Sequence, residues 1–261
     1  MLGAGRTVTR VWPDQPAVRE YIDRPRDDLV GERLGDDDTY HQVNGPFEQY
    51  ERTVSSAGGE LTERTTYRLN IPWFGWLFAL PVRLLIGRRG FDPVHHRPHT
   101  TPWWAPPDQI SPRQALIMGL LAAASMSSAF TNTLFTQTVK FAADDFGVGN
   151  TGVGVAGAIV RAGIIVAIPV AVMADRVGRQ RVIRIVAWAA PTITALGALA
   201  PTFPALVATQ AIGRPLGLAL DFLIAVVAAE EMPRNSRAYA VSVMAMAAGL
   251  GAGIAVMALP L

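Results

Sequence analysis

The chain of 261 residues has 23 basic and 21 acidic side chains, a formal net charge of +2 and no cysteine. Half of its residues are hydrophobic, and its mean hydropathy of +0.26 is high for a water-soluble protein. The absence of cysteine excludes disulfides and thiolate metal sites. Residues 1–113 hold 15 of the acidic and 14 of the basic side chains. This imbalance predicts a charged amino-terminal segment followed by a membrane segment.

Residues 1–110 are expected to form a small α+β extension with a disordered start. Residues 1–40 are acidic and contain prolines, a composition typical of loosely ordered chain. Two runs at about 47–55 and 60–69, joined at Gly58-Gly59, predict a β-hairpin over about 47–69.

A short apolar helix and a linker are expected next. The stretch at about 72–88 is shorter than a membrane span and contains Pro81, so we expect an interfacial or packed helix. The following HHRPH, residues 95–99, has prolines around it and no acidic or cysteine cluster. That composition favours an ordinary linker over a metal site.

Residues 114–261 contain five apolar runs and are expected to form a transmembrane bundle. A helix that crosses the hydrocarbon needs about 20 mostly apolar residues. The alternative, a soluble bundle of buried helices, would require polar outer faces, which these runs lack. The expected spans are about 115–138, 153–173, 182–200, 204–229 and 238–260.

Arginines in the short connections predict the orientation. Four follow the second run and two follow the fourth, whereas the connections after the first and third runs have no excess of positive charge. Positively charged short loops stay in the cytoplasm. We therefore expect a multi-pass protein of the plasma membrane, with a cytoplasmic amino terminus and with the 174–181 and 230–237 loops inside.

The first run carries a polar stripe. Ser125, Ser128, Asn132 and Thr136 are three or four residues apart, so they share one helical face. Such a stripe serves either helix packing or contact with a substrate. Both interpretations are open for Ser128 and Asn132.

Three charges lie inside the expected spans. Arg161 is near the centre of the second run, Arg214 is near the centre of the fourth, and Asp221 follows two turns later. Each charge at the bilayer centre costs about 2.5–3.5 kcal/mol, so each needs a polar neighbour or a wet cavity. One interpretation is an ion-paired triad that fixes helix packing. The other is an anion- or proton-sensitive site with Asp221 as the protonatable group.

Small-residue ladders predict where helices approach closely, since small side chains let backbones come together. The ladders are Gly154-Ala158-Ala162 and Ala245-Gly249-Gly253.

The stretch AVMADRVGRQRVIRI, residues 171–185, gathers one aspartate and four arginines between two apolar runs. Cytoplasmic retention explains the arginines but not Asp175 or Gly178. Gly178 allows a tight turn, and Asp175 is suited to pair with a guanidinium or a helix amino terminus. Asp175, Arg176, Gly178, Arg179 and Arg181 are therefore expected to form a cytoplasmic hinge between two spans, which the resemblance described next implies to be a gating loop.

This loop resembles the signature between the second and third helices of the major facilitator superfamily of secondary transporters. The match is good from Ala174 to Arg181, whereas Ala171 and Met173 stand where the family has glycine and leucine. AAEEMPRNSRAYAVS, residues 228–242, resembles the family's loop from the fourth to the fifth helix, with Glu230 and Arg237 as its charged members. GRPLG, residues 213–217, resembles the arginine-glycine motif of the fourth helix.

The resemblance implies an all-α polytopic membrane protein, a major-facilitator-like amino-terminal half-bundle with a small cytoplasmic extension. Its function would be transport of a small solute by alternating access between two six-helix halves. The implied partners are a small-molecule substrate, a coupling proton, the lipid bilayer and a second half that is missing here, and no nucleic acid. Because the chain stops at Leu261 after the fifth run, we expect it to be a fragment.

The hairpin and following helix resemble the final third of START-like helix-grip lipid-binding domains, whose earlier strands are not recognisable here. This implies an alternative function, a membrane-anchored lipid-binding or regulatory module in which the helices are the anchor. An enzyme or a cofactor is not expected, because no nucleophile with a base, phosphate-binding glycine loop or metal-ligand set is recognisable.

Overall fold

The computed structural model describes residues 5–88 and 101–259. The expected linker motif at residues 95–99 lies outside the described residues. The chain forms two compact units. The sheet unit comprises residues 1–120 and 232–239, and the helical unit comprises residues 121–231 and 240–261.

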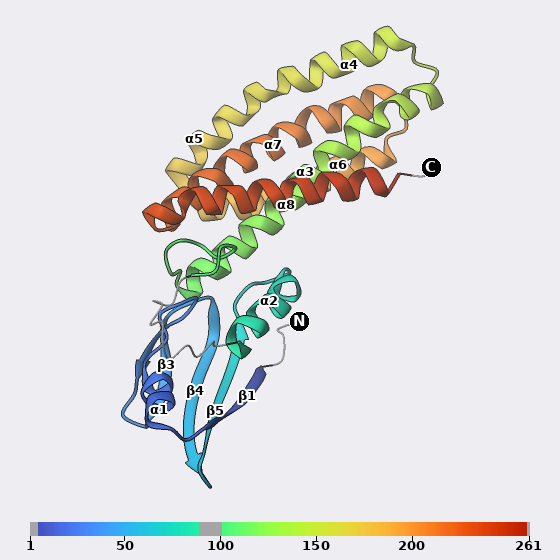
Figure 1. Ribbon diagram of the computed structural model, residues 1–261. Coiled ribbons are helices and arrows are strands. Elements are labelled where there is room, and N and C mark those ends of the chain that lie inside the picture. Colours follow the sequence, from blue (N-terminus) through green and yellow to red (C-terminus); the bar gives the residue numbers. More distant parts are fainter. Residues whose placement is uncertain (1–4, 89–100, 260–261) are drawn as a thin grey trace. The chain divides into compact units, whose positions relative to one another are not determined.

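The sheet unit is built on five antiparallel strands and two helices (Figure 1). In chain order these are β1 (Arg6–Pro13), α1 (Pro16–Asp23), β2 (Gly31–Leu34), β3 (Thr39–Asn44), β4 (Phe47–Ala57), β5 (Glu60–Leu69) and α2 (Gly75–Gly87). The strand order is β1-β5-β4-β3-β2. β4 and β5 form the hairpin, and its two glycines have φ of 61° and 83°, the left-handed pair of a type I′ turn.

The expectation of disorder in residues 1–40 is wrong for residues 5–40, the part of this range that the structure describes. β1 pairs with β5 from Arg6 opposite Tyr67 to Pro13 opposite Glu60, and α1 buries Val18 and Ile22. The acidic composition is misleading because several of the charges are paired inside the fold, as in the Arg26–Asp28 ion pair at 2.8 Å. Three strands and a helix therefore precede β4, where the sequence comparison with helix-grip domains finds none.

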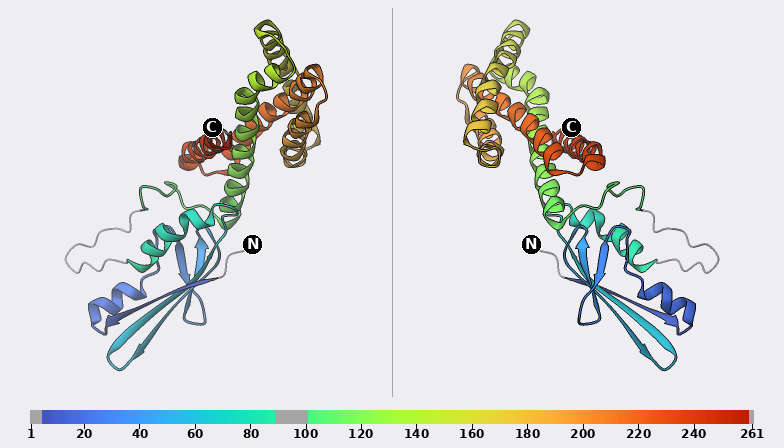
Figure 2. Two further views of the ribbon diagram at one scale, coloured as in Figure 1. Left: turned by 90° about the vertical axis from the view of Figure 1, so that its right-hand side faces the viewer. Right: turned by 90° about the vertical axis from the view of Figure 1, so that its left-hand side faces the viewer.

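Both helices of the sheet unit cover the same face of the sheet (Figure 2). Val82 and Ile86 of α2 pack against three aromatic side chains of the hairpin strands, Phe47, Tyr50 and Tyr67. The alternation of buried and exposed positions along β5 gives this face its apolar character. The space between α2 and the sheet is thus a packed aromatic core.

Within residues 5–88 and 101–259, five helices are long and apolar enough to cross a membrane, as the sequence predicts. The second is interrupted by a 3₁₀ turn and the third ends in one, and a further 3₁₀ turn precedes the fifth. The segments are α3 (Pro112–Asp145), α4 (Asn150–Ala162), η1 (Gly163–Val166), α5 (Ala167–Val177), α6 (Arg179–Leu196), η2 (Gly197–Leu199), α7 (Phe203–Glu231), η3 (Arg234–Ser236) and α8 (Arg237–Met257).

A capping box sets the start of α3. The Ser111 hydroxyl accepts a hydrogen bond from the Gln114 backbone N–H at 3.2 Å, and the Gln114 side chain accepts one from the Ser111 N–H at 2.9 Å. Pro112 occupies the first helical position, where its missing N–H has no partner to lose.

α7 is the central helix of the helical unit, and glycines bring its neighbours close. Gly163 lies against Ala211, where an added Cβ would be 2.7 Å from the carbonyl oxygen. A Cβ on Gly213 would be 2.5 Å from the Thr194 hydroxyl of α6 and 3.3 Å from its backbone N. Between α3 and α8, a Cβ on Gly251 would be 2.1 Å from the Met126 carbonyl oxygen. These glycines allow backbone approaches that no larger residue permits.

The predicted small-residue ladders do not make these approaches. Within the described residues, a Cβ on Gly154, Gly249 or Gly253 would meet no other heavy atom within 4 Å. The spacing identifies a helix face made of small residues. It permits a close helix–helix contact only where a second helix packs on that face.

The outward faces of the five long helices are apolar. Large side chains such as Ile165, Ile168 and Trp188 are between 65% and 78% exposed. At most 44% of the most apolar 18-residue window of any of these helices is buried. An apolar exterior of this extent is suited to lipid and not to water.

Candidate functional site

A single glycine separates α5 from α6. Gly178 has φ of 106°, a conformation that L side chains rarely adopt, and its N–H donates to the Ala174 carbonyl at 3.0 Å. Because one helix ends and the next begins around this residue, Asp175 and Arg179 remain neighbours across the turn. The Arg179 Nε and Nη2 atoms lie 3.2 and 3.1 Å from Asp175 Oδ1.

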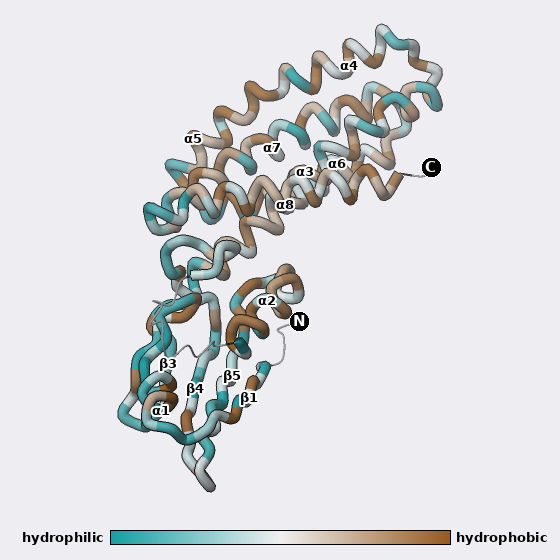
Figure 3. Tube along the Cα trace, in the orientation of Figure 1, coloured by the Kyte–Doolittle hydropathy of each residue, from teal (hydrophilic) through white to brown (hydrophobic). Residues whose placement is uncertain are grey.

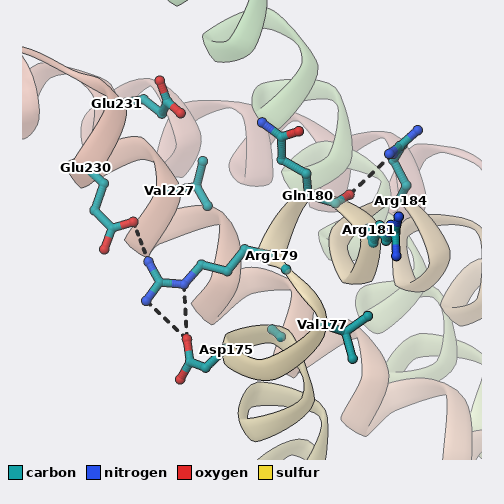
Figure 4. Close-up of a pocket in the computed structure, with 11 residues that line it drawn as sticks. Asp175, Val177, Arg179, Gln180, Arg181, Arg184, Val227, Glu230 and Glu231 are labelled. Atoms are coloured by element: carbon teal, nitrogen blue, oxygen red, sulfur yellow. Dashed lines mark hydrogen bonds and ion pairs between the residues drawn. The ribbon is translucent and has the colours of Figure 1, made fainter.

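Arg179 also binds a carboxylate of another helix. Its Nη1 atom donates to Glu230 at the end of α7, and the guanidinium lies between the two carboxylates (Figure 4). We call Asp175, Arg179 and Glu230 the loop triad. It joins the ends of three helices, and residues of all three line a surface pocket around it. Arg179 is partly exposed and both carboxylates are exposed, so these ion pairs contribute little to the stability of the fold. Their main effect is to fix the three helix ends relative to one another.

The other predicted loop residues lie outside the triad. Arg181 lines the same pocket, whereas Arg176 is exposed and does not line it. Arg237 is the first residue of α8 and is exposed. The sequence groups these arginines with Arg179, but the structure gives only Arg179 two acidic partners among the described contacts.

The polar residues predicted inside the spans gather along the seam between α3 and α7. Ser128 donates to the Gly217 carbonyl at 3.2 Å, and Asp221 follows Gly217 by one turn of α7. The Asn132 amide faces Gly217, 3.4 Å from where a Cβ would stand. One turn further along α3, the guanidinium carbon of Arg214 lies 5.5 Å from the ring centre of Phe135.

Arg161 lies on α4 and is exposed, and its charge acts on Arg214 of α7. Among the described residues, no ion pair joins Asp221 to either arginine, the pairing that one of the two interpretations from sequence requires. The seam therefore holds one guanidinium group, Arg214, and one carboxylate, Asp221, that do not form an ion pair with each other.

Ser125, which shares the stripe, serves helix packing, since it donates to the Met244 carbonyl of α8 at 3.2 Å. Thr136 is exposed and donates to the Asn132 carbonyl of its own helix at 3.0 Å, so its hydroxyl is satisfied without a neighbouring helix.

Sequence analysis missed an acidic residue that holds the loop between α7 and α8. Asp108 accepts hydrogen bonds from the Asn235 backbone N–H at 3.1 Å and side-chain amide at 3.0 Å, and its own N–H donates to the Ser236 hydroxyl at 3.0 Å. Tyr239 donates to the Trp104 carbonyl at 3.0 Å. We call these contacts the loop clamp.

The loop clamp is fixed to the sheet. The Gln109 side chain donates to Asp27 at 2.9 Å, and the Ile110 carbonyl accepts from the Gly45 N–H at 2.8 Å. The only signal for this in the sequence is one aspartate in a proline-rich segment, a pattern too common to predict a contact over more than 120 residues.

No family model, curated protein or solved structure matches the chain. In the part of the chain that the structure describes, no three histidine, aspartate or glutamate side chains are grouped so that they could hold a metal ion.

Proposed function

We propose that the chain is the amino-terminal part of a major-facilitator-like secondary transporter, which moves a small solute across the plasma membrane by alternating access. The observation that carries this proposal is the loop triad. It joins the two loop segments on which the family resemblance rests, 51 residues apart in the chain. Two independent resemblances that meet in one ionic contact support a common functional origin.

In the proposed mechanism the loop triad holds three helix ends together on the cytoplasmic side. Arg179 ties the end of α5 and the start of α6 to the end of α7, so these ends move as one body. Alternating access requires rigid bodies that rock about a central site. A second half-bundle, on a longer chain or a partner, completes the path.

The seam of α3 and α7 is the proposed solute path. Arg161 and Arg214 provide positive potential, Asn132 and Ser128 provide hydrogen-bonding groups, and Asp221 is the proposed site for a coupling proton. Charged groups at this depth of a membrane are costly and are retained where they face a pathway or each other.

The 261 residues contain no cysteine, and any cysteine elsewhere in the complete protein is first replaced by serine. Asn132→Cys, placed in the complete native protein in sealed vesicles, is labelled with a membrane-impermeant maleimide from either side. A transporter predicts labelling from both sides, because the path opens alternately. Labelling from one side only, or from neither, contradicts alternating access.

The role of the loop triad is tested in the same Asn132→Cys protein. Asp175→Asn and Arg179→Ala should each shift the ratio of labelling from the two sides, since either change breaks the loop triad. Arg176→Ala is the matched control, because it removes the same charge from the same loop without touching the triad. Equal ratios in all three variants would remove the gating role.

The alternative function is a membrane-anchored lipid-binding or regulatory module. It is favoured by the sheet unit, which has five strands and its own core where the sequence indicates only a hairpin. The aromatic packing beneath α2 fits a regulatory element better than a lipid cavity. Labelling of Asn132→Cys from neither side would favour this function.

A further inference from the structure

Helix α2 has apolar side chains on two opposite faces. Ala79, Val82 and Ile86 are buried in the sheet unit. The outer face is formed by two tryptophans and three leucines that the fold leaves exposed, and α2 is the most hydrophobic part of that unit (Figure 3). The exposed fractions are 77% for Trp73, 74% for Trp76, 49% for Leu77, 64% for Leu80 and 39% for Leu84.

Four of these side chains form one stripe. Leu77, Leu80 and Leu84 follow Trp76 at one, four and eight residues, which places all four on one side of the helix. Trp73 lies in the turn just before the helix begins. A helix that is apolar on all sides is normally enclosed on all sides. The sheet encloses only one side of α2, so its composition implies a second apolar environment.

The backbone at the start of α2 holds Trp73 outward. Trp73 has φ of 65°, a left-handed conformation that is uncommon for a bulky residue. The tight turn that imposes it is closed by a 2.7 Å hydrogen bond from the Phe74 N–H to the Pro72 carbonyl. Such conformations persist at functional positions, where the placement of a side chain compensates for the strain.

The charges beside the stripe are all positive. Residues 64–91 contain no acidic side chain, and Arg83 and Arg88 are exposed on and at the end of α2. Tryptophan with leucine and arginine is the composition of surfaces that lie at the boundary of lipid headgroups and acyl chains. The arginines complement the phosphates of that layer.

We propose that the outer face of α2 docks on the surface of the bilayer that holds the chain's own five spans. The occupant is lipid because the same chain is membrane-anchored, so α2 is always near headgroups at high effective concentration. The docking sets the sheet unit against the membrane and is independent of any transport activity.

The test measures the immersion depth of single spin labels on the complete protein in vesicles. Single cysteines are introduced at Leu77→Cys, Leu80→Cys and Leu84→Cys after any cysteine outside these 261 residues has been replaced by serine. Val43→Cys on β3 is the control, since Val43 is an exposed apolar residue of the same unit. Docking predicts that the three α2 labels collide more with oxygen than with a water-soluble nickel complex. The control label should show the reverse.

Two outcomes would overturn the proposal. α2 labels that behave like the Val43→Cys label would mean that the stripe faces water. α2 labels inaccessible to both reagents would mean that protein covers the stripe. Using three positions keeps the result independent of one damaged variant.

The charge contribution has its own control. Arg83→Glu should reduce the immersion of the Leu80→Cys label in vesicles rich in phosphatidylglycerol. Arg64→Glu makes the same charge change at an exposed position of β5 and should leave the depth unchanged. Equal effects of the two variants would contradict a specific lipid contact at α2.

Discussion

At the scale of single residues, Arg52 accounts for much of the order in the sheet unit. Its side chain is fully buried, with Nη2 2.7 Å from Glu32 Oε2 and Nη1 3.6 Å from Glu63 Oε1. Tyr50 donates to the same Glu32 at 2.5 Å, and Arg52 stacks 3.8 Å from the ring centre of Tyr40. The contacts tie β2 to β4 and β5, so a buried cation holds the amino-terminal segment in the fold.

The protonation of Glu32 follows from these contacts. Burial by itself would raise the pKa of Glu32, but the hydrogen bonds and charge of Arg52 outweigh it, so the pKa lies below its usual value. A carboxyl with a lowered pKa stabilises the fold fully above the pKa of the unfolded chain, and this contribution is lost as the pH falls through the folded value.

Glu32→Gln should therefore destabilise the sheet unit by about 3 kcal/mol, because it leaves Arg52 with less compensation in the core. Hydrogen exchange of the β2 and β4 amides, followed by mass spectrometry, measures the change. Glu51→Gln is the control, since Glu51 is exposed on β4 and should change stability by less than about 0.5 kcal/mol. Similar exchange in both variants would contradict a structural role for the buried pair.

The same pair predicts a pH dependence. Protection of β2 and β4 should be highest above pH 4.5, the usual value for a glutamate, and should fall below it as the unfolded chain gains the proton first. In Glu32→Gln this dependence should be weaker, because the titrating group is gone. A wild type and variant with parallel pH profiles would assign the effect to other carboxyls.

At the scale of elements, helix packing depends on which glycine meets a neighbour. Gly249 and Gly251 lie two residues apart on α8, yet only Gly251 lies against the α3 backbone. The small-residue spacing selects Gly249, whereas the packing of α8 against the Met126 carbonyl of α3 selects Gly251.

Gly251→Ala should destabilise the helical unit by about 1–3 kcal/mol, because the new methyl group must displace backbone. Gly249→Ala should be neutral or stabilise α8 by up to about 1 kcal/mol, as alanine is the better helix former. Thermal unfolding of the purified protein in detergent compares the two. A lower melting temperature for Gly249→Ala than for Gly251→Ala would contradict this packing.

The loop clamp makes a second prediction at this scale. Asp108→Ala removes two hydrogen bonds to Asn235, and bonds to a charged group contribute about 1.5–3 kcal/mol. Hydrogen exchange in residues 233–239 should accelerate by about tenfold or more, since about 1.4 kcal/mol corresponds to a factor of ten. Asp144→Ala, at an exposed position near the end of α3, is the control and should leave that loop unchanged.

At the scale of the whole molecule, the charge distribution predicts which loops share a side of the membrane. The 174–181 loop carries four basic residues in its vicinity, whereas the loop between α6 and α7 carries none. Gln180→Cys should therefore be protected from an impermeant maleimide in intact cells, and Thr202→Cys should react. The opposite pattern would invert the orientation and place the loop triad outside.

Much of the architecture follows from the sequence by itself. The five spans are predictable because crossing hydrocarbon imposes a length and a composition on each helix separately. The hairpin is predictable because two glycines encode its turn locally. The neighbourhood of Asp175 and Arg179 is also local, since four residues and one glycine define it.

Only the tertiary structure decided the rest, because the contacts concerned join distant residues. Order in residues 5–40 depends on Arg52 and on pairing with β5, and composition alone does not reveal either contact. Glu230 completes the loop triad from 51 residues away, Asp108 reaches Asn235 across 127, and the effective glycines are those that a neighbouring helix meets. Which face of α2 is exposed also depends on the tertiary structure, because the sheet unit buries the opposite face.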